Sequence, residues 1–272
     1  MTPGLPIVTR DKPPGVRETF FQATASTLIY GARDAVLVDT FMTVKQAHAL
    51  ADWVAAKRKN LTTIYITHGH GDHWFGLGTL LERFPKAKAV ATPNSVKEMH
   101  GNASPEALDG AWKAGFPGQI PDKLVFAEEM NGNVIDLEGQ ELVAVELGHT
   151  DTDSTTCLHV PSIGLVVAGD AVYNEVHLYL AQSNPQARRV WIAALDKIEA
   201  LKPREVVASH KRPENPDDPR TIEETRQYIR DFDRLAEKTT AAQELYDEML
   251  ELYPSWVNPG WALWSSARAV KP

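Results

Sequence analysis

Three imidazoles and a carboxylate lie within seven consecutive positions of this chain. The segment Thr67–His73 reads THGHGDH. Imidazole is the commonest metal ligand in proteins, and a carboxylate is its usual anionic companion. A loop crowded with such groups is costly to place near a core unless each polar atom finds a partner. The segment therefore predicts a metal site.

The spacing within this segment indicates ligands for two ions. His68 and His70 are two positions apart, and such residues point to the same side of an extended chain. Asp72 and His73 follow Gly71, where we expect the chain to turn into a helix. Adjacent residues at a helix start diverge, so this pair can reach a second point nearby.

Further candidate ligands come directly after predicted strands. They are His149, Asp170 and His210. In α/β folds, functional groups gather just beyond the carboxyl ends of strands. Gly148 and Gly169 precede two of these residues and allow the backbone to approach closely. Each candidate alone would more often be structural, but together with the loop they form a plausible ligand set.

The elements that must position these groups alternate between strands and helices. Strands are predicted at 26–30, 35–39, 61–66, 87–91, 134–136, 141–147, 155–160, 164–168 and 205–208, and helices at 43–59, 73–84, 185–201 and 221–252. This order indicates helices packed on sheets. Residues 101–133 are rich in glycine and proline and predict a long functional loop.

The order of the motifs resembles the metallo-β-lactamase superfamily. The matching motifs are His68-x-His70-x-Asp72-His73, Gly148-His149, Gly169-Asp170 and Ser209-His210, with Asp39 in the position of the first motif. The resemblance spans about residues 20–212. It implies an α/β (α+β) fold, a four-layer αββα sandwich. We expect a catalytic domain over residues 1–220 and a C-terminal helical extension over 221–272 packing on it.

The resemblance also implies a dinuclear ligand set. The first ion would be bound by His68, His70 and His149, the second by Asp72, His73 and His210, and Asp170 would bridge them. Asp39 would orient the loop by hydrogen bonds rather than bind metal. Zn²⁺ is the expected ion, and Mn²⁺, Fe²⁺ and Co²⁺ also suit His/Asp donors.

The expected activity is metal-dependent hydrolysis of an ester, lactone or thioester by a metal-bridging hydroxide. Asp72 is the expected general acid-base. Tyr173 resembles a lactonase tyrosine that contacts the substrate carbonyl, although it can also pack at a loop edge. A bridging Asp170 argues against β-lactamase activity. The alternatives are a mononuclear iron persulfide dioxygenase, β-lactam or phosphotriester hydrolysis, a nuclease, and a metal-binding protein without catalysis.

Composition limits the class of partner and the compartment. The net charge is −8 and no basic stripe occurs, so we expect no nucleic-acid partner. The chain has neither a signal-peptide pattern nor an apolar stretch of about 18 residues, so we expect no membrane partner and a cytoplasmic protein. The single cysteine, Cys157, allows no intrachain disulfide and is expected to be a buried inert thiol.

Aromatic residues suggest how the substrate pocket is closed. The candidates are Trp112, Phe116, Trp256, Trp261 and Trp264. If they cover the site, the partner is a small-molecule substrate with an apolar portion; otherwise they form a homodimer interface. Among the remaining histidines, His177 is a candidate for pocket lining, whereas His48, His100 and His159 are expected at the surface or packed.

Overall fold

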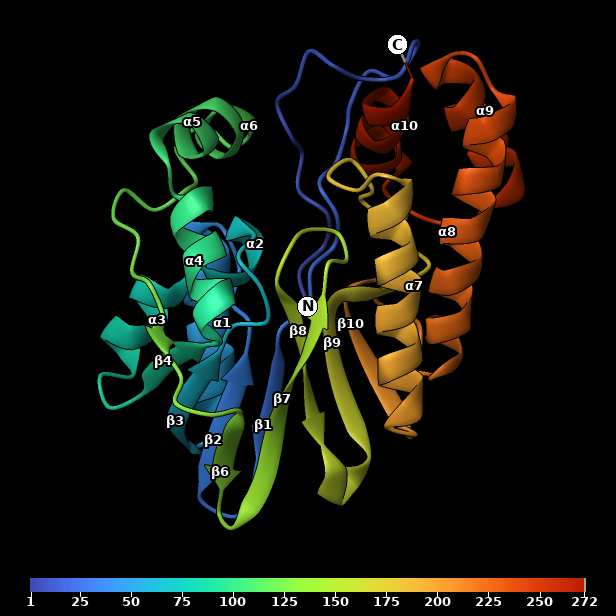
Figure 1. The fold of residues 1–272 in the computed structure, drawn as a ribbon. Helices are drawn as coiled ribbons and strands as arrows, with labels where there is room; N and C mark the ends of the chain where they lie inside the picture. The colour runs from blue at the N-terminus through green and yellow to red at the C-terminus, as the bar shows by residue number, and fades with distance from the viewer. Residues whose placement is uncertain (272) are drawn as a thin grey trace.

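Two β-sheets lie side by side in the middle of the molecule, and helices cover both outer faces (Figure 1). The computed structural model describes residues 1–271. One sheet has the order β1-β2-β3-β4-β5 and the other β10-β9-β8-β7-β6. This arrangement confirms the predicted αββα sandwich.

The first sheet and its helices come from the N-terminal half. The strands are β1 (Thr27–Tyr30), β2 (Asp34–Val38), β3 (Asn60–Tyr65), β4 (Lys88–Ala91) and β5 (Glu128–Glu129). The helices are α1 (Val44–Ala56), α2 (Gly71–Trp74), α3 (Leu77–Arg83), α4 (Pro93–Asn102), α5 (Pro105–Ala107) and α6 (Lys113–Gly115), with a π-helical segment at Leu108–Trp112. Strands β2 to β5 run parallel, so their carboxyl ends share one edge.

The second sheet and its helices come from the C-terminal half. The strands are β6 (Val134–Leu137), β7 (Gln140–Gly148), β8 (Thr155–Val160), β9 (Leu165–Asn174) and β10 (Glu205–Lys211). The helices are α7 (Pro185–Ala200), α8 (Arg220–Lys238), α9 (Ala242–Leu252) and α10 (Trp264–Val270). Within the described residues no helix is both long and apolar enough to cross a membrane.

Three apolar clusters hold the layers together. Between the sheets, Val38 and Tyr65 pack in one cluster with Leu158. A second cluster joins the first sheet to α1, α3 and α4. A third joins β9 and α7 to α8 and α9, with Trp191 and Phe232 among its members. The C-terminal helices thus share a core with the second sheet, and a domain boundary at residue 220 stays a prediction.

Several elements differ from the sequence-based expectation. The helix predicted at 73–84 is two helices, because the Gly76 amide donates to the Phe41 carbonyl (2.7 Å) instead of continuing a helix. The helix predicted at 221–252 is interrupted before α9, where the Glu244 carboxylate accepts from the Thr240 amide (2.8 Å). The loop predicted at 101–133 contains helical turns over 105–115.

Candidate metal centre

The histidine-rich loop runs from β3 to α2 and packs tightly against α4. A Cβ at Gly69 would lie 2.4 Å from the Glu98 Cβ, so only glycine fits there without displacing α4. The Trp74 indole nitrogen donates to the Gly69 carbonyl (2.9 Å) and fixes the loop from the other end. This packing leaves His68 and His70 buried.

One group of potential metal ligands contains His68, His70, Asp151 and Asp170. One ligand atom from each lies within 4.8 Å of the others. Asp151 Oδ2 is 2.7 Å from His70 Nδ1 and 3.6 Å from His68 Nε2. All four residues are buried. Such a set can surround one cation.

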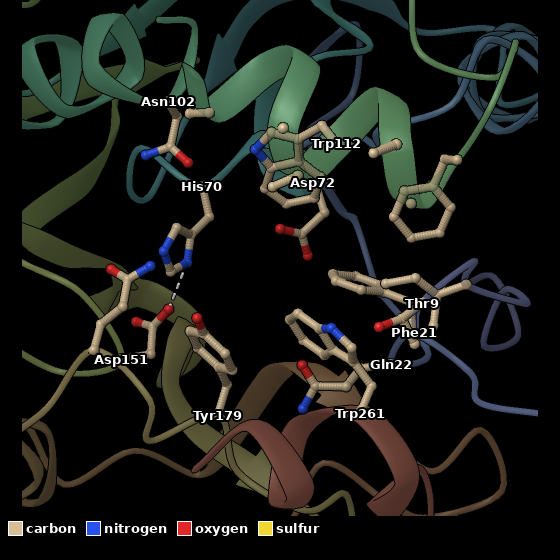
Figure 2. Close-up of a pocket in the computed structure, with 18 of the residues that line it drawn as sticks. Thr9, Phe21, Gln22, His70, Asp72, Asn102, Trp112, Asp151, Tyr179 and Trp261 are labelled. Atoms are coloured by element: carbon tan, nitrogen blue, oxygen red, sulfur yellow. Dashed lines mark ion pairs between the residues drawn. The ribbon is translucent and has the colours of Figure 1, made fainter. Parts of the chain in front are cut away.

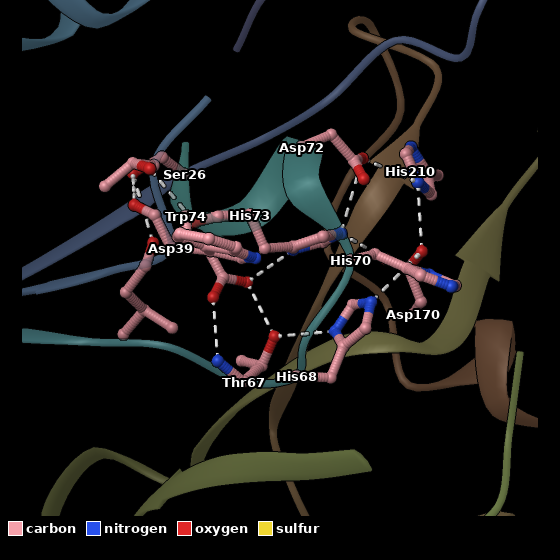
Figure 3. Close-up of polar contacts among 12 residues, drawn as sticks. Ser26, Asp39, Thr67, His68, His70, Asp72, His73, Trp74, Asp170 and His210 are labelled. Atoms are coloured by element: carbon pink, nitrogen blue, oxygen red, sulfur yellow. Dashed lines mark hydrogen bonds and ion pairs between the residues drawn. The ribbon is translucent and has the colours of Figure 1, made fainter. Parts of the chain in front are cut away.

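The second group contains Asp72, His73 and His210. Asp72 Oδ2 lies 3.4 Å from His73 Nε2 and 3.5 Å from His210 Nε2. Asp170 reaches this group too, since its Oδ1 is 3.3 Å from His73 Nε2 and its Oδ2 is 3.0 Å from His210 Nε2 (Figure 3). Asp170 therefore lies between the two groups, where a shared ligand would stand.

Several polar atoms of both groups are buried and lack a hydrogen-bond partner among the described residues. In the part of the chain that the structure describes, the buried atoms without a hydrogen-bond partner include His68 Nε2, His70 Nε2, Asp72 Oδ2, His73 Nε2, Asp151 Oδ2 and Asp170 Oδ1. Each such group costs about 1–3 kcal/mol if it stays unpaired. Cations would remove this penalty, and imidazole with carboxylate donors suits Zn²⁺ and neighbouring transition metals. The residues present therefore fit divalent metal ions.

A cavity of about 340 Å³ opens onto both groups. Its lining includes His70, Asp72, Asp151, Asp170 and His210. Aromatic side chains also line it, namely Phe21, Trp112, Phe116, Tyr179 and Trp261, most of which are labelled in Figure 2. Trp261 stacks on Tyr179 with ring centroids 5.0 Å apart and an interplanar angle of 4°. Among the described residues that line the cavity there is no lysine or arginine.

The sequence over residues 20–210 matches the model of a protein family described as the metallo-beta-lactamase superfamily. The chain belongs to this superfamily. Metallo-β-lactamase-fold proteins are generally metal-dependent hydrolases, and the buried His/Asp groups indicate the same broad class here. No curated protein matches the sequence significantly.

Solved structures of superfamily proteins share the fold. A metallo-beta-lactamase family protein from Thermus thermophilus has a TM-score of 0.65 and 19% identity, covering 98% of this chain and 90% of that protein. A metallo-beta-lactamase from Pontibacter korlensis has a TM-score of 0.60 and 16% identity, with coverage of 82% and 92%. One from Erythrobacter litoralis has a TM-score of 0.56 and 17% identity, with coverage of 80% and 88%.

Burial and neighbouring charges shift the pKa values of the histidines and aspartates in the candidate metal centre. Burial lowers the pKa of His68 to about 4, and the neighbouring His73 adds to the shift. For His73, burial opposes protonation, but the Asp72 and Asp170 carboxylates outweigh it and raise the pKa well above its usual value. Burial also disfavours ionised Asp170, but His210 and His73 hold its pKa well below the usual range. The carboxylates thus stay anionic and attract positive charge.

Asp39 lies beneath the loop and orients it. Its Oδ1 accepts from the Thr67 amide (2.8 Å), and its Oδ2 accepts from the Thr67 hydroxyl (2.8 Å) (Figure 3). The same Oδ2 lies 2.9 Å from His73 Nδ1, which leaves Nε2 of that ring directed at the second group. Such hydrogen bonds to a ligating histidine fix its ring orientation. Asp39 thus occupies the place expected for a residue that orients ligands without binding metal.

The structure brings together six of the seven ligands suggested by sequence and leaves out His149. His149 Nδ1 instead pairs with Asp153 Oδ1 at 2.6 Å, and Asp151 stands in the first group. His149 Nε2 is also buried without a hydrogen-bond partner among the described residues, so the assignment of His149 to the first ion stays a prediction. Sequence reasoning missed Asp151 because the turn after Gly148 decides which side chain of this segment points inward. Asp151 lies only two positions after His149 in the sequence, so the signal that could have identified it was a second potential ligand in the same turn.

Tyr173 does not reach the substrate cavity. It is fully buried, and its hydroxyl donates to Asp170 Oδ2 (3.3 Å). A direct contact between this hydroxyl and a substrate carbonyl therefore does not agree with the structure. Strand β9 continues to Asn174 rather than ending before Asp170, so Tyr173 stays within the sheet. Tyr179, which sequence reasoning did not select, lines the cavity instead.

The other expected residues divide between cavity and core. Trp112, Phe116 and Trp261 line the cavity, whereas Trp256 and Trp264 are absent from its described lining. His177 is buried away from the cavity, with Nδ1 at 2.9 Å from the Tyr228 hydroxyl.

Cys157 is buried in β8, as expected for an inert thiol. Burial raises its pKa to about 12, so the thiol stays protonated at neutral pH. A thiolate is the nucleophilic form of cysteine, which argues against a catalytic role for Cys157.

Proposed function

We propose that the protein is a dinuclear hydrolase that cleaves an ester, lactone or thioester of a small molecule with an apolar portion. The observation that carries the proposal is the position of Asp170, which reaches both groups of ligands: its Oδ2 lies 3.9 Å from His68 Nε2 and 3.0 Å from His210 Nε2. Zn²⁺ is the ion we expect at both positions, in keeping with the His/Asp donors.

When divalent ions are bound, they lower the pKa of a water molecule toward ~7 and polarise the scissile carbonyl. The protein's own contribution is proton handling. Asp72 lines the cavity and its Oδ2 lacks a hydrogen-bond partner among the described residues. It can take the proton that the attacking water loses and deliver it to the leaving oxygen or sulfur. A carbon–oxygen bond forms at the carbonyl, and the bond to the leaving atom breaks.

The cavity supports an uncharged, apolar substrate portion. Phe21, Trp112 and Trp261 offer flat apolar surfaces, which bind rings and hydrocarbon chains by burial and stacking. The described lining offers no lysine or arginine for a substrate carboxylate. Neutral esters and lactones therefore fit better than glutathione thioesters or β-lactam antibiotics, both of which carry carboxylates.

A substrate panel tests the proposal. It contains an aryl ester, an acyl lactone, S-lactoylglutathione, a chromogenic β-lactam and an organophosphate, each assayed with the zinc-loaded protein. We expect turnover of the neutral ester or lactone and much slower turnover of the carboxylate-bearing substrates. A protein that holds one iron per chain and consumes oxygen would instead favour a persulfide dioxygenase.

Replacement of His70 links the activity to the site. His70 lies in the first group and lines the cavity. H70A should abolish turnover of whichever substrate is cleaved while the protein stays folded by circular dichroism. H100A, which removes an imidazole that stacks on Phe126 outside the cavity, should retain activity. Wild-type turnover by H70A would refute the assigned site.

A further inference from the structure

Asp151 occupies a position in the first ligand group that the motif pattern gives to His149. We propose that Asp151, and not His149, binds the first metal ion together with His68 and His70. The inference rests on the metal centre of the proposed function and concerns the composition of that centre. It is carried by the position of Asp151 Oδ2, which is buried and lies close to the ligand atoms of His68 and His70.

The turn after β7 holds the Asp151 carboxylate toward the other ligands. The Thr150 hydroxyl donates to Asp151 Oδ1 (2.9 Å), which leaves Oδ2 free of this contact. Asp151 Oδ2 forms an ion pair with His70 Nδ1 at 2.7 Å. It is also 3.6 Å from His68 Nε2. The three ligand atoms His68 Nε2, His70 Nδ1 and Asp151 Oδ2 thus converge, which is the arrangement expected around a common cation.

The same turn directs His149 elsewhere. Gly148 has a positive φ of 94°, so the chain leaves β7 in a conformation that favours glycine. The Thr150 amide then donates to the Thr152 carbonyl (2.9 Å) and closes the turn around the buried Asp151. The His149 side chain is 16% exposed and pairs with Asp153, which is 73% exposed. Its Nε2 lacks a hydrogen-bond partner as well, so experiment has to compare the two residues directly.

With Asp151 as a ligand, the two metal positions have matching donors. Each has two imidazoles and one carboxylate of its own, and Asp170 is shared. Three carboxylates would then face two divalent ions, whereas a set with His149 in place of Asp151 would contain two carboxylates. Oxygen-rich donor sets also suit Mn²⁺ and Fe²⁺, so the centre should accept these ions as well as Zn²⁺.

Metal content of two matched variants tests the proposal. D151N keeps an oxygen for the Thr150 hydroxyl but removes the anionic ligand, and H149N removes the rival imidazole. Each protein is dialysed against buffered Zn²⁺, and zinc per chain is measured by elemental analysis. We expect two ions in wild type and H149N and about one in D151N. Loss of an ion in H149N, or retention of both ions in D151N, would overturn the proposal.

Histidine NMR of the wild-type protein gives a second test that needs no variant. Nitrogen-15 spectra of the imidazoles are recorded with and without Zn²⁺. We expect zinc to shift the ring signals of His68, His70, His73 and His210 and to leave those of His149 near their metal-free positions. A zinc-induced shift at His149 as large as at His68 would overturn the assignment. Wild type that binds no zinc at all would refute the metal centre, and the proposed function with it.

Discussion

Two tyrosines six positions apart have different surroundings, and their phenylalanine variants should differ accordingly. Tyr179 is half-buried in the cavity wall, whereas Tyr173 is buried and donates to Asp170. Y179F should raise KM for the cleaved ester by about 2- to 10-fold, the value of one hydrogen bond. Y173F should leave KM unchanged and lower kcat, because it loosens Asp170.

Steady-state kinetics with zinc-loaded proteins separate these outcomes. Equal zinc content in both variants is the control, since a lost ion would lower kcat without a change at the cavity wall. If Y173F raised KM more than Y179F, Tyr173 rather than Tyr179 would contact the substrate.

His177 makes the folded state sensitive to acid. Burial lowers its pKa from 6.5 to about 3. The unfolded chain therefore takes up a proton on this residue near pH 6.5, whereas the folded protein does so only near pH 3. The contribution of neutral His177 to stability is full above pH 6.5 and decreases as the pH falls toward 3. H177N should thus lose less stability on acidification than wild type.

Urea unfolding at several pH values between about 7 and about 4 measures this difference. Asparagine can still pair with the Tyr228 hydroxyl, which keeps the local structure. H48N, at an exposed position on α1, is the control and should follow the wild-type curve. A wild-type to H177N difference that is constant with pH would contradict the prediction.

At the scale of the element, the close packing of the histidine-rich loop against α4 depends on the absence of a side chain at Gly69. A Cβ at Gly69 would meet the backbone carbon of Glu98 at 2.6 Å and the Met99 amide nitrogen at 2.8 Å. G69A should therefore destabilise the protein by about 1–3 kcal/mol, as overpacking does, and weaken zinc binding.

G101A is the matched control for this prediction. Gly101 lies on α4, and a Cβ at this position would meet nothing within 4 Å. Alanine there should be neutral or stabilise α4 by about 0.5–1 kcal/mol. Thermal melting and zinc titration of both variants provide the comparison. Equal behaviour of G69A and G101A would show that the close approach to α4 is unimportant.

Elements with a strong local signal could be predicted from the sequence. The helices predicted at 43–59 and 185–201 are present, because Thr43 and Gln46 form a capping box at the start of α1 and Asn184 caps α7. Elements decided by tertiary contacts could not. Strand β9 continues through Asp170 because a bulge in its pairing with β10, next to Gly169 at φ 58°, absorbs the irregularity. The inward direction of Asp151 depends on the turn geometry after Gly148, which residue types alone do not specify.

At the scale of the whole molecule, metal should stabilise the fold. Three carboxylates and four imidazoles converge on one buried region, and several of their atoms are unpaired in the described structure. A ligand present at 100 times its Kd stabilises by about 2.7 kcal/mol. One kcal/mol shifts Tm by about 2–4 °C in a protein of this size class, so each ion should raise Tm by roughly 5–10 °C.

Differential scanning calorimetry after EDTA treatment, followed by addition of Zn²⁺, measures the effect. Mg²⁺ is the control ion, because it prefers all-oxygen ligands and should give a much smaller shift. An unchanged Tm on both chelation and zinc addition would contradict a metal centre in this region.

The ligand loop could be found from local sequence, but the cavity walls could be found only in part: Trp112, Phe116 and Trp261 were candidates for covering the site, whereas Val8 and Phe21 were not. The walls combine Val8 and Phe21 near the N-terminus, Trp112 after α4, and Trp261 near the C-terminus. Nothing in the spacing of these residues shows that they meet. Their convergence depends on how the terminal segments fold over the sandwich.

Val8 and Trp261 both lie outside the stretch from 20 to 210 that matches the superfamily. Part of the cavity wall thus lies outside the matched stretch, whereas every candidate ligand lies within it. A laboratory library that varies only Val8 and Trp261 would reshape this part of the wall while every candidate ligand to the cations is inherited unchanged.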